Sequence, residues 1–284
     1  MLLILLLSLL LTPIISYTRV TELINTTPKF PIILMHGILS NQEKMSDLQL
    51  FLETSFNLNV IVPEIGNGIL NSINVPLNIQ GEMLCEELNN NDLLKNGFNF
   101  IGVSQGGILG RYYIERCGKY QVNNFITLVS PHGGIYIEKI AKMFNMYSKS
   151  MQEHYSFISY WRDPFNYMKY IDSILLARLN NEVNSESYNE NKARFTSLNN
   201  FIMVYSPSDD ILHPPESGKF STYDINSLNT ISIEKTHMYD NLGLNELNNS
   251  NKIHIYATNC THSQHKDYIC FKQLYNMFEE FCYN

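Results

Sequence analysis

A serine lies between glycines at the point where an apolar run gives way to a helical pattern. The run FNFIGV has the character of a buried strand, and residues 105–117 repeat apolar side chains at helical spacing. Between them, Gly102-Val103-Ser104-Gln105-Gly106 has the form Gly-x-Ser-x-Gly. In a turn of this kind the hydroxyl is held out at a helix amino terminus, where amide donors favour developing negative charge. A simple tight turn is the alternative, but the strand before and the helix after favour a nucleophile at Ser104.

A serine hydroxyl is a weak nucleophile, so a base must take its proton and an acid must orient that base. The strand-like run NFIMVYS leads into PSDDILHPPES, and the run KIHIYAT leads into NCTHSQHKDY. The acid is therefore Asp209 or Asp210, and the base is His262 or His265. We favour His262 because it is nearer to the end of its strand. The order serine, acid, histidine, each after a later strand, is that of α/β-hydrolases.

Two backbone amides are candidates for stabilising the negative oxygen of an acyl-transfer intermediate. One is the amide of Gln105, directly after the serine, and the other is the amide of Ile38, in the loop HGILSN after the first strand-like run. His36, in the same loop, is interpreted as shaping the loop rather than transferring protons. The cysteines and histidines lack the spacing of a zinc site, and we expect neither a metal nor a cofactor.

These residues need a scaffold that gathers distant loops, and the chain alternates strand-like and helix-like segments. Such alternation produces a mostly parallel sheet with helices on both faces, in which the carboxyl ends of the strands share one edge. The predicted fold is therefore α/β, an α/β-hydrolase fold. The predicted strands are residues 31–37, 58–64, 98–104, 123–130, 200–206 and 252–258, and the main predicted helices are residues 42–56, 79–90, 105–117 and 266–282.

Residues 135–199 contain no strand-like run. The segments AKMFNMYSKSM and SFISYWRDPFNYMKYIDSILLARLNN are helical in period, rich in Met, Phe and Tyr, and include Trp161, the only tryptophan. We interpret residues 135–199 as a helical cap inserted over the carboxyl edge of the sheet, within a single domain of residues 17–284. Ordinary packing of these helices against the core is the alternative for most of their side chains.

The amino terminus, MLLILLLSLLLTPIIS, is apolar but shorter than the roughly 20 residues that a membrane span requires. We interpret residues 1–16 as a cleaved signal peptide, with an uncleaved anchor as the alternative. Entry into the secretory route agrees with acceptor sequons for N-glycosylation at Asn25 and Asn248. The net charge of −7 argues against a nucleic-acid partner, and we expect no stable membrane span.

The chain resembles the palmitoyl-protein thioesterases from about residue 31 to its carboxyl terminus. The resemblance rests on PIILMHG, EIGNG, LKNGFNFIGVSQGG, ERCG, YWRDP, DDILHPPES and NLGLNEL, in the order of the family. It implies that Ser104, Asp209 and His262 form a catalytic triad; Asp209 is chosen because DDILHP matches the family pattern Asp-x-hydrophobic-hydrophobic-x-Pro from its first aspartate. It also implies a disulfide between Cys85 and Cys117.

Two loops depart from the family pattern. The family usually has Gly-Asp before its histidine, whereas this chain has Cys260-Thr261, and the loop after the first His-Gly lacks the usual Gly-Asp-Ser. These departures affect the expected loop geometry but remove no triad residue. A glycan on Asn259 would lie three residues from the base, so we expect this sequon to be poorly occupied. The pairing of Cys260, Cys270 and Cys282 stays open.

The resemblance implies a serine hydrolase that removes long-chain fatty acyl groups, such as palmitoyl, from the cysteine thioesters of proteins or peptides. The fatty acyl chain would lie in a groove under the cap, and the protein would act in the lysosome or be secreted. A lipase or carboxylesterase that cleaves oxygen esters is one alternative function. A catalytically inactive lipid-binding protein is the other.

Overall fold

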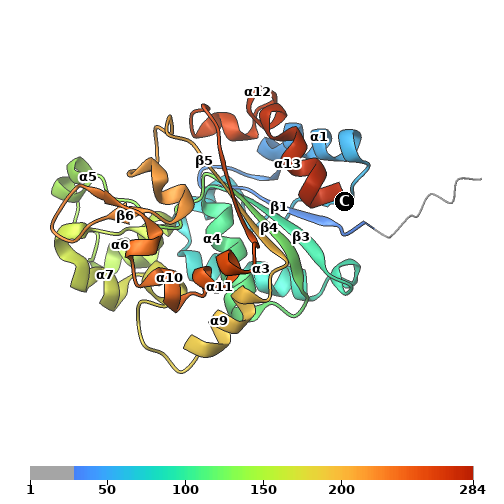
Figure 1. Cartoon of the computed structure of the whole chain (residues 1–284). Helices are drawn as coiled ribbons and strands as arrows, with labels where there is room; N and C mark the ends of the chain where they lie inside the picture. The colour runs from blue at the N-terminus through green and yellow to red at the C-terminus, as the bar shows by residue number, and fades with distance from the viewer. Residues whose placement is uncertain (1–28, 284) are drawn as a thin grey trace, which may run out of the picture.

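The computed structural model describes residues 29–283, so the predicted signal peptide of residues 1–16 and the sequon at Asn25 lie outside the described residues. A sheet of six parallel strands forms its centre, in the order β2-β1-β3-β4-β5-β8 (Figure 1). The strands are β1 (Ile32–Met35), β2 (Val60–Ile61), β3 (Phe98–Val103), β4 (Val122–Leu128), β5 (Asn200–Tyr205) and β8 (Ile253–Ala257). The helices that cover the sheet include α1 (Ser46–Phe56), α3 (Leu77–Asn89), α4 (Gln105–Tyr112), α12 (Tyr268–Phe271) and α13 (Tyr275–Phe278).

Alternating side chains of the strands face two separate hydrophobic cores. Ile32 and Leu34 of β1 belong to the core formed with α1, α12 and α13. Ile33 and Met35 belong to the other core, formed with α3 and α4. Figure 1 shows these two groups of helices on opposite sides of the sheet. Both faces of the strands are therefore covered, as the apolar strand-like runs of the sequence predict. Within residues 29–283, none of the helices combines the length and the apolar character needed to cross a bilayer.

The strand predicted at residues 58–64 is shorter in the structure, where β2 contains only Val60 and Ile61. Pro63 follows within two residues and has no N–H group to donate to a neighbouring strand. β2 is also the edge strand of the sheet, with a partner on one side only. The apolar run therefore continues beyond the point where strand pairing ends.

The single helix predicted at residues 266–282 is divided into short α, 3₁₀ and π segments. Between α12 and α13 lies η9 (Lys272–Leu274), and η10 (Glu279–Tyr283) follows α13. Phe271, Leu274 and Met277 are all buried and lie three residues apart, which is the repeat of a 3₁₀-helix. Burying all three side chains on one face therefore favours local 3₁₀ geometry, which interrupts a continuous α-helix.

The segment between β4 and β5, residues 129–199, consists of short helices and loops, with a single bridge between Ile135 and Trp161. Figure 1 shows α5, α6 and α7 at one end of the molecule, beside β6. Its helices are α5 (Glu138–Met143), α6 (Lys149–His154), η4 (Ser156–Tyr160), η5 (Pro164–Asn166), α7 (Tyr167–Ser173), α8 (Leu175–Leu179) and α9 (Tyr188–Thr196). The elements between β5 and β8 are η6 (Pro215–Lys219), β6 (Thr222–Tyr223), β7 (Thr230–Ile231), η7 (Ile233–Lys235), α10 (Met238–Asn241) and α11 (Leu244–Asn249).

A buried ion pair holds the β4–β5 segment together. The guanidinium of Arg162 donates to both carboxylate oxygens of Glu182, over 2.6 and 2.8 Å. The hydroxyls of Tyr170 and Tyr167 also donate to Glu182. Burial alone would lower the pKa of Arg162, but attraction to Glu182 and the hydrogen bonds between them raise this pKa above its ordinary value. The arginine of the YWRDP motif is therefore a structural residue of this segment.

Removing one partner of this pair is expected to destabilise the protein strongly. Arg162→Met would leave the Glu182 carboxylate buried without its counter-charge, a change that costs about 3–5 kcal/mol in comparable buried pairs. The double variant Arg162→Met/Glu182→Leu removes both charges and should recover much of that loss. Urea unfolding of both variants measures the difference. Equal destabilisation by the single and the double variant would contradict the role given to the pair.

Candidate active site

Ser104 occupies a strained turn between β3 and α4. Its backbone has φ 54° and ψ −123°, in a region that L-residues other than glycine rarely adopt. The turn is possible because its glycines leave room: a Cβ atom at Gly102 would lie 2.5 Å from the Cα atom of Gly107. Five residues of local sequence thus hold the hydroxyl at the amino terminus of α4.

Three side chains from distant loops form one hydrogen-bonded row. Ser104 Oγ lies 2.8 Å from His262 Nε2, and His262 Nδ1 lies 2.7 Å from Asp209 Oδ2. The carboxylate accepts, so Nδ1 carries its proton and Nε2 accepts the proton of the serine hydroxyl. The three residues follow β3, β5 and β8, at the carboxyl edge of the sheet. This is the edge at which the sequence pattern places the site.

Asp209 remains charged in this position. Burial alone would raise its pKa, but the hydrogen bond and the attraction from His262 lower it, as do the amides of Leu212 and Ile211. Those two amides donate to Asp209 Oδ1 over 2.8 and 2.9 Å. The pKa of Asp209 is therefore below its ordinary value, and the ionised carboxylate can stabilise a protonated His262.

The sequence pattern leaves two candidates for the acid, Asp209 and Asp210, and two for the base, His262 and His265. The structure shows which of each pair joins the row of Ser104. Asp210 Oδ1 accepts a hydrogen bond from the backbone amide of His262 over 3.0 Å, so it contacts the loop and not the ring. His265 is fully buried; its Nδ1 donates to the Thr261 carbonyl over 3.0 Å, and its Nε2 accepts from the Thr258 hydroxyl over 2.8 Å. Neither residue joins the row of Ser104.

Acidification is expected to destabilise the fold partly through His265. Burial is the main cause that lowers the pKa of His265 below its ordinary value. As the pH falls below about 6.5, the ordinary pKa of histidine, the unfolded chain binds a proton at this residue that the folded chain does not. The free energy of unfolding therefore falls by up to about 1.4 kcal/mol per pH unit. This loss ends once the pH is below the pKa of His265 in the folded protein. Urea unfolding at several pH values should show a smaller slope for His265→Gln than for the wild type. An unchanged slope would contradict this assignment.

The two proposed oxyanion donors belong to the residue after Ser104 and to the loop after β1. A Cβ atom at Gly37 would lie 3.0 Å from Ser104 Cβ, so the loop after β1 passes directly beside Ser104. In the described part of the chain, the amides of Ile38 and Gln105 donate no hydrogen bond to another residue. Both amides are therefore free to bind an oxygen above Ser104.

A buried histidine holds the Ile38 loop in place. The Nδ1 atom of His36 lies 2.9 Å from the Gly37 carbonyl, and its Nε2 lies 3.2 Å from Glu64 Oε1. Glu64 Oε2 also accepts the amide of Gln42 over 2.8 Å. His36 thus shapes the loop, as interpreted from the sequence. Its partner Glu64, in the EIGNG motif, has a role that sequence reasoning missed.

The side chain of Gln105 forms a second contact that the sequence did not reveal. Its amide nitrogen donates to the Ser72 carbonyl over 2.9 Å, and its oxygen accepts from the Tyr160 hydroxyl over 3.2 Å. Ser156 of η4 donates to the same Ser72 carbonyl over 2.7 Å. Gln105, directly after Ser104, is therefore tied to α2 (Ile69–Asn74) and to the β4–β5 segment. The only sequence signal was the glutamine of GVSQGG, whose partners lie far along the chain.

Two disulfides flank these elements. The structure contains the Cys85–Cys117 bridge that the resemblance implies, and it also pairs Cys260 with Cys270. Cys282 is buried and forms no disulfide, and burial raises the pKa of its thiol. Within residues 29–283, the histidines, cysteines and carboxylates form no group of three that could hold a metal ion.

The parallel sheet, with a serine at the turn from strand to helix, defines the class of the protein. Solved structures with this architecture include an extracellular α/β-hydrolase from a Paenibacillus species, which is 12% identical and has a TM-score of 0.52 over 90% of this chain and 100% of that chain. Lipase B of Aspergillus fumigatus is 12% identical, with a TM-score of 0.50 over 84% of this chain and 49% of that chain. The chain has the α/β-hydrolase fold, which confirms the fold predicted from the sequence.

Sequence comparison places the chain within that class. A family model described as palmitoyl protein thioesterase matches residues 31–262. Palmitoyl-protein thioesterase 3 of Dictyostelium discoideum is 36% identical over 83% of this chain and 86% of its own length. Lysosomal thioesterase PPT2-B of Xenopus laevis is 29% identical over 82% of this chain and 86% of its own length. The chain belongs to the palmitoyl-protein thioesterase family.

Proposed function

We propose that this protein is a serine thioesterase that removes long-chain fatty acyl groups from cysteine residues of proteins or peptides. The observation that carries the proposal is the row formed by Ser104, His262 and Asp209, at 2.8 and 2.7 Å, in a chain of this family. The assignment of Ser104 as nucleophile, His262 as base and Asp209 as the orienting acid rests on this geometry. No step of the proposed reaction requires a metal or a cofactor.

The reaction proceeds by acyl transfer in two steps. His262 Nε2 takes the proton of Ser104 as its oxygen attacks the thioester carbonyl carbon, and the amides of Ile38 and Gln105 bind the resulting oxyanion. The carbon–sulfur bond then breaks, and a thiolate leaves, which needs little protonation as it departs because its conjugate thiol has a pKa of about 8.5. The protonated His262 gives its proton to the departed sulfur and becomes neutral again. Neutral His262 then takes a proton from water as the water oxygen attacks the acyl carbon, the bond to Ser104 Oγ breaks to release the fatty acid, and His262 returns the proton to Ser104.

The fatty acyl chain is proposed to lie against the β4–β5 segment, which would then act as the cap predicted from the sequence. This segment exposes large apolar side chains to solvent, and it approaches the acid loop, where the Tyr136 amide donates to the His213 carbonyl over 2.8 Å. Each methylene buried there would contribute about 0.8 kcal/mol to binding. Exposed members of this set are Met143, Phe144, Phe165 and Met168.

The lysosome or the secretory route is the proposed location. The support comes from relatives whose names describe them as lysosomal, including those of Xenopus laevis and Bos taurus. The signal peptide predicted at residues 1–16 would provide entry to this route. Asn248 of α11, predicted to be glycosylated, is exposed, and its side-chain nitrogen donates to the Tyr239 hydroxyl over 3.0 Å. Occupancy of the exposed Asn259 is expected to be low.

Paired substrates test the function. The kcat/KM of the protein is measured on a peptide that carries palmitoyl-cysteine and on the same peptide that carries palmitoyl-serine. The proposal predicts faster hydrolysis of the thioester. A strong preference for the oxygen ester would indicate a lipase or carboxylesterase instead. Failure to hydrolyse either peptide would indicate a lipid-binding protein.

A further inference from the structure

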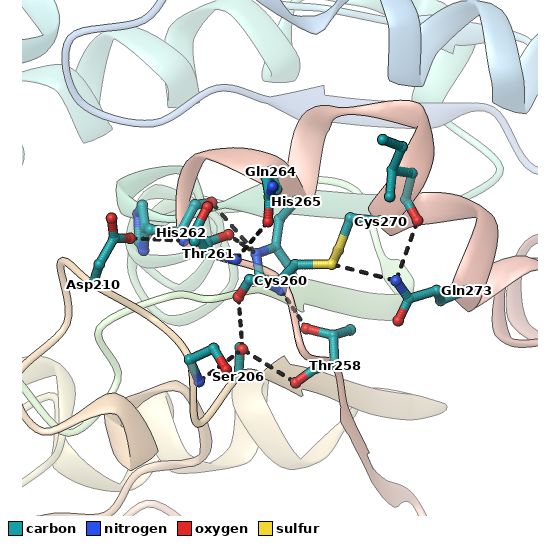
Figure 2. The surroundings of a disulfide bond; sticks show 12 residues. Ser206, Asp210, Thr258, Cys260, Thr261, His262, Gln264, His265, Cys270 and Gln273 are labelled. Atoms are coloured by element: carbon teal, nitrogen blue, oxygen red, sulfur yellow. Dashed lines mark hydrogen bonds between the residues drawn. A yellow bond between two sulfur atoms is a disulfide. The ribbon is translucent and has the colours of Figure 1, made fainter.

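The loop that carries His262 is crosslinked to a neighbouring helix. Cys260, two residues before His262, is bonded to Cys270 of α12 (Figure 2). Both cysteines are buried, with exposed fractions of 3% and 0%. Phe271, the next residue of α12, is part of the core between the helices and the sheet. The disulfide therefore connects the histidine loop to a fixed part of the fold.

A serine hydroxyl joins the same loop to the loop of the acid. Ser206, which follows β5, directs its single O–H toward the carbonyls of Cys260 and Thr258, which lie 2.7 and 3.1 Å from its oxygen. Its oxygen accepts the amide of Ser208 over 3.1 Å, and its own carbonyl accepts the amide of Asp209 over 3.1 Å. Figure 2 shows Ser206 directed toward the histidine loop. The positions of Asp209 and His262 are thus coupled through one buried residue.

Asp210 provides a third contact, at the histidine itself. Its Oδ1 atom accepts the His262 amide over 3.0 Å, and Figure 2 shows its side chain directed toward His262. Asp210 is exposed to solvent, as are Asn259, Ser263 and Gln264 around it. An exposed loop with few apolar contacts opens easily unless other interactions hold it.

These contacts lie close to the ring that would transfer the proton, because Cys260 is two residues before His262 and Asp210 contacts the His262 amide. The His262 ring must keep both of its hydrogen bonds, at 2.7 and 2.8 Å, for proton transfer. A displacement of about 1 Å is enough to lower catalysis by about a hundredfold.

We propose that the Cys260–Cys270 disulfide and Asp210 are positioning residues for His262. They touch neither the substrate nor the reacting atoms, and they act by holding the histidine loop so that the imidazole stays between Ser104 and Asp209. This inference rests on the proposed function of the row.

The two disulfides of the chain provide a matched test. Cys260→Ala/Cys270→Ala opens a bridge with a sequence separation of 10, and Cys85→Ala/Cys117→Ala opens one with a separation of 32. The longer loop should contribute more to stability. We therefore expect the Cys85/Cys117 variant to show the larger loss of melting temperature but to keep kcat within about twofold. The Cys260/Cys270 variant should show a kcat lower by about tenfold or more, with KM changed by less than about twofold. If the variant with the larger loss of melting temperature also showed the larger loss of kcat, the proposal would be overturned.

Asp210 variants provide a second test, on a surface residue whose replacement leaves the core intact. Asp210→Ala removes the acceptor of the His262 amide and is expected to lower kcat about three- to tenfold without changing KM. Asp210→Asn keeps an oxygen acceptor and should recover most of the lost kcat. Equal activity of the alanine and asparagine variants would contradict the positioning role.

A spectroscopic readout separates failure of this inference from failure of the proposed function. The proton on His262 Nδ1, bonded to Asp209, is expected to give a downfield proton NMR resonance in the wild type. This resonance should broaden or disappear in the Cys260/Cys270 variant and persist in the Cys85/Cys117 variant, whether or not a thioester is hydrolysed. Persistence in both variants overturns the positioning role. An inactive wild type, or an active Ser104→Ala variant, overturns the function instead.

Discussion

Ser104→Ala is expected to lower kcat for thioester hydrolysis by about 10⁴- to 10⁶-fold, because it removes the only atom that forms the covalent bond to the acyl group. The proposed oxyanion donors are backbone amides, so Ile38 and Gln105 retain theirs in the variant. Some rate above the uncatalysed reaction should therefore remain, and KM should change little. Single-turnover and steady-state assays on a palmitoyl-cysteine peptide measure the loss.

The loss of kcat can be assigned to the missing hydroxyl only if the Ser104→Ala variant is folded. The alanine takes over the strained backbone of Ser104, with φ 54°, so the melting temperature of the variant is compared with that of the wild type. A folded Ser104→Ala protein that hydrolyses the thioester within about tenfold of the wild-type rate would exclude Ser104 as the nucleophile.

Asp209→Asn is expected to lower kcat by about 10⁴-fold by reversing the proton arrangement of His262. An asparagine that still accepts the amides of Ile211 and Leu212 through its oxygen presents its NH₂ group to His262 Nδ1. Nδ1 must then accept, so the proton moves to Nε2, which can no longer take the proton of Ser104. Rates measured across a range of pH separate this effect from a simple change of charge.

A matched control addresses the loss of one negative charge from the protein. Asp172 lies on α7 and is exposed to solvent. Asp172→Asn should keep kcat and KM close to their wild-type values. If the kcat of Asp209→Asn were as close to the wild-type value as that of Asp172→Asn, the acid of the site would have to be another residue.

The strained turn that presents Ser104 could be predicted from the sequence because its signal is local. The turn at Ser104 depends on glycines within three residues, and the strand and helix around it each have a clear apolar period. The acid and the base were harder to choose, because Asp209 and Asp210 are adjacent in one loop and both contact His262, Asp209 at the ring and Asp210 at the backbone amide. Only the tertiary structure determines which oxygen faces the ring.

The supporting contacts could not be predicted, because they join residues that are far apart in the sequence. The contacts of His36 with Glu64 and of Gln105 with Tyr160 span 28 and 55 residues. Pairing among Cys260, Cys270 and Cys282 likewise has no signal in spacing alone. Apolar periodicity identifies the layers of the fold, whereas polar partners depend on how the loops meet.

The most direct test of the central claim is to locate the acyl group during turnover. The protein is mixed with a palmitoyl-cysteine peptide, quenched with acid within the first turnover, and examined by peptide mass spectrometry. The account predicts one palmitoyl adduct on Ser104, which is absent from the Ser104→Ala variant and disappears once the substrate is consumed. Continued hydrolysis with an adduct on a different residue, or with no adduct on Ser104 at any time, would contradict it.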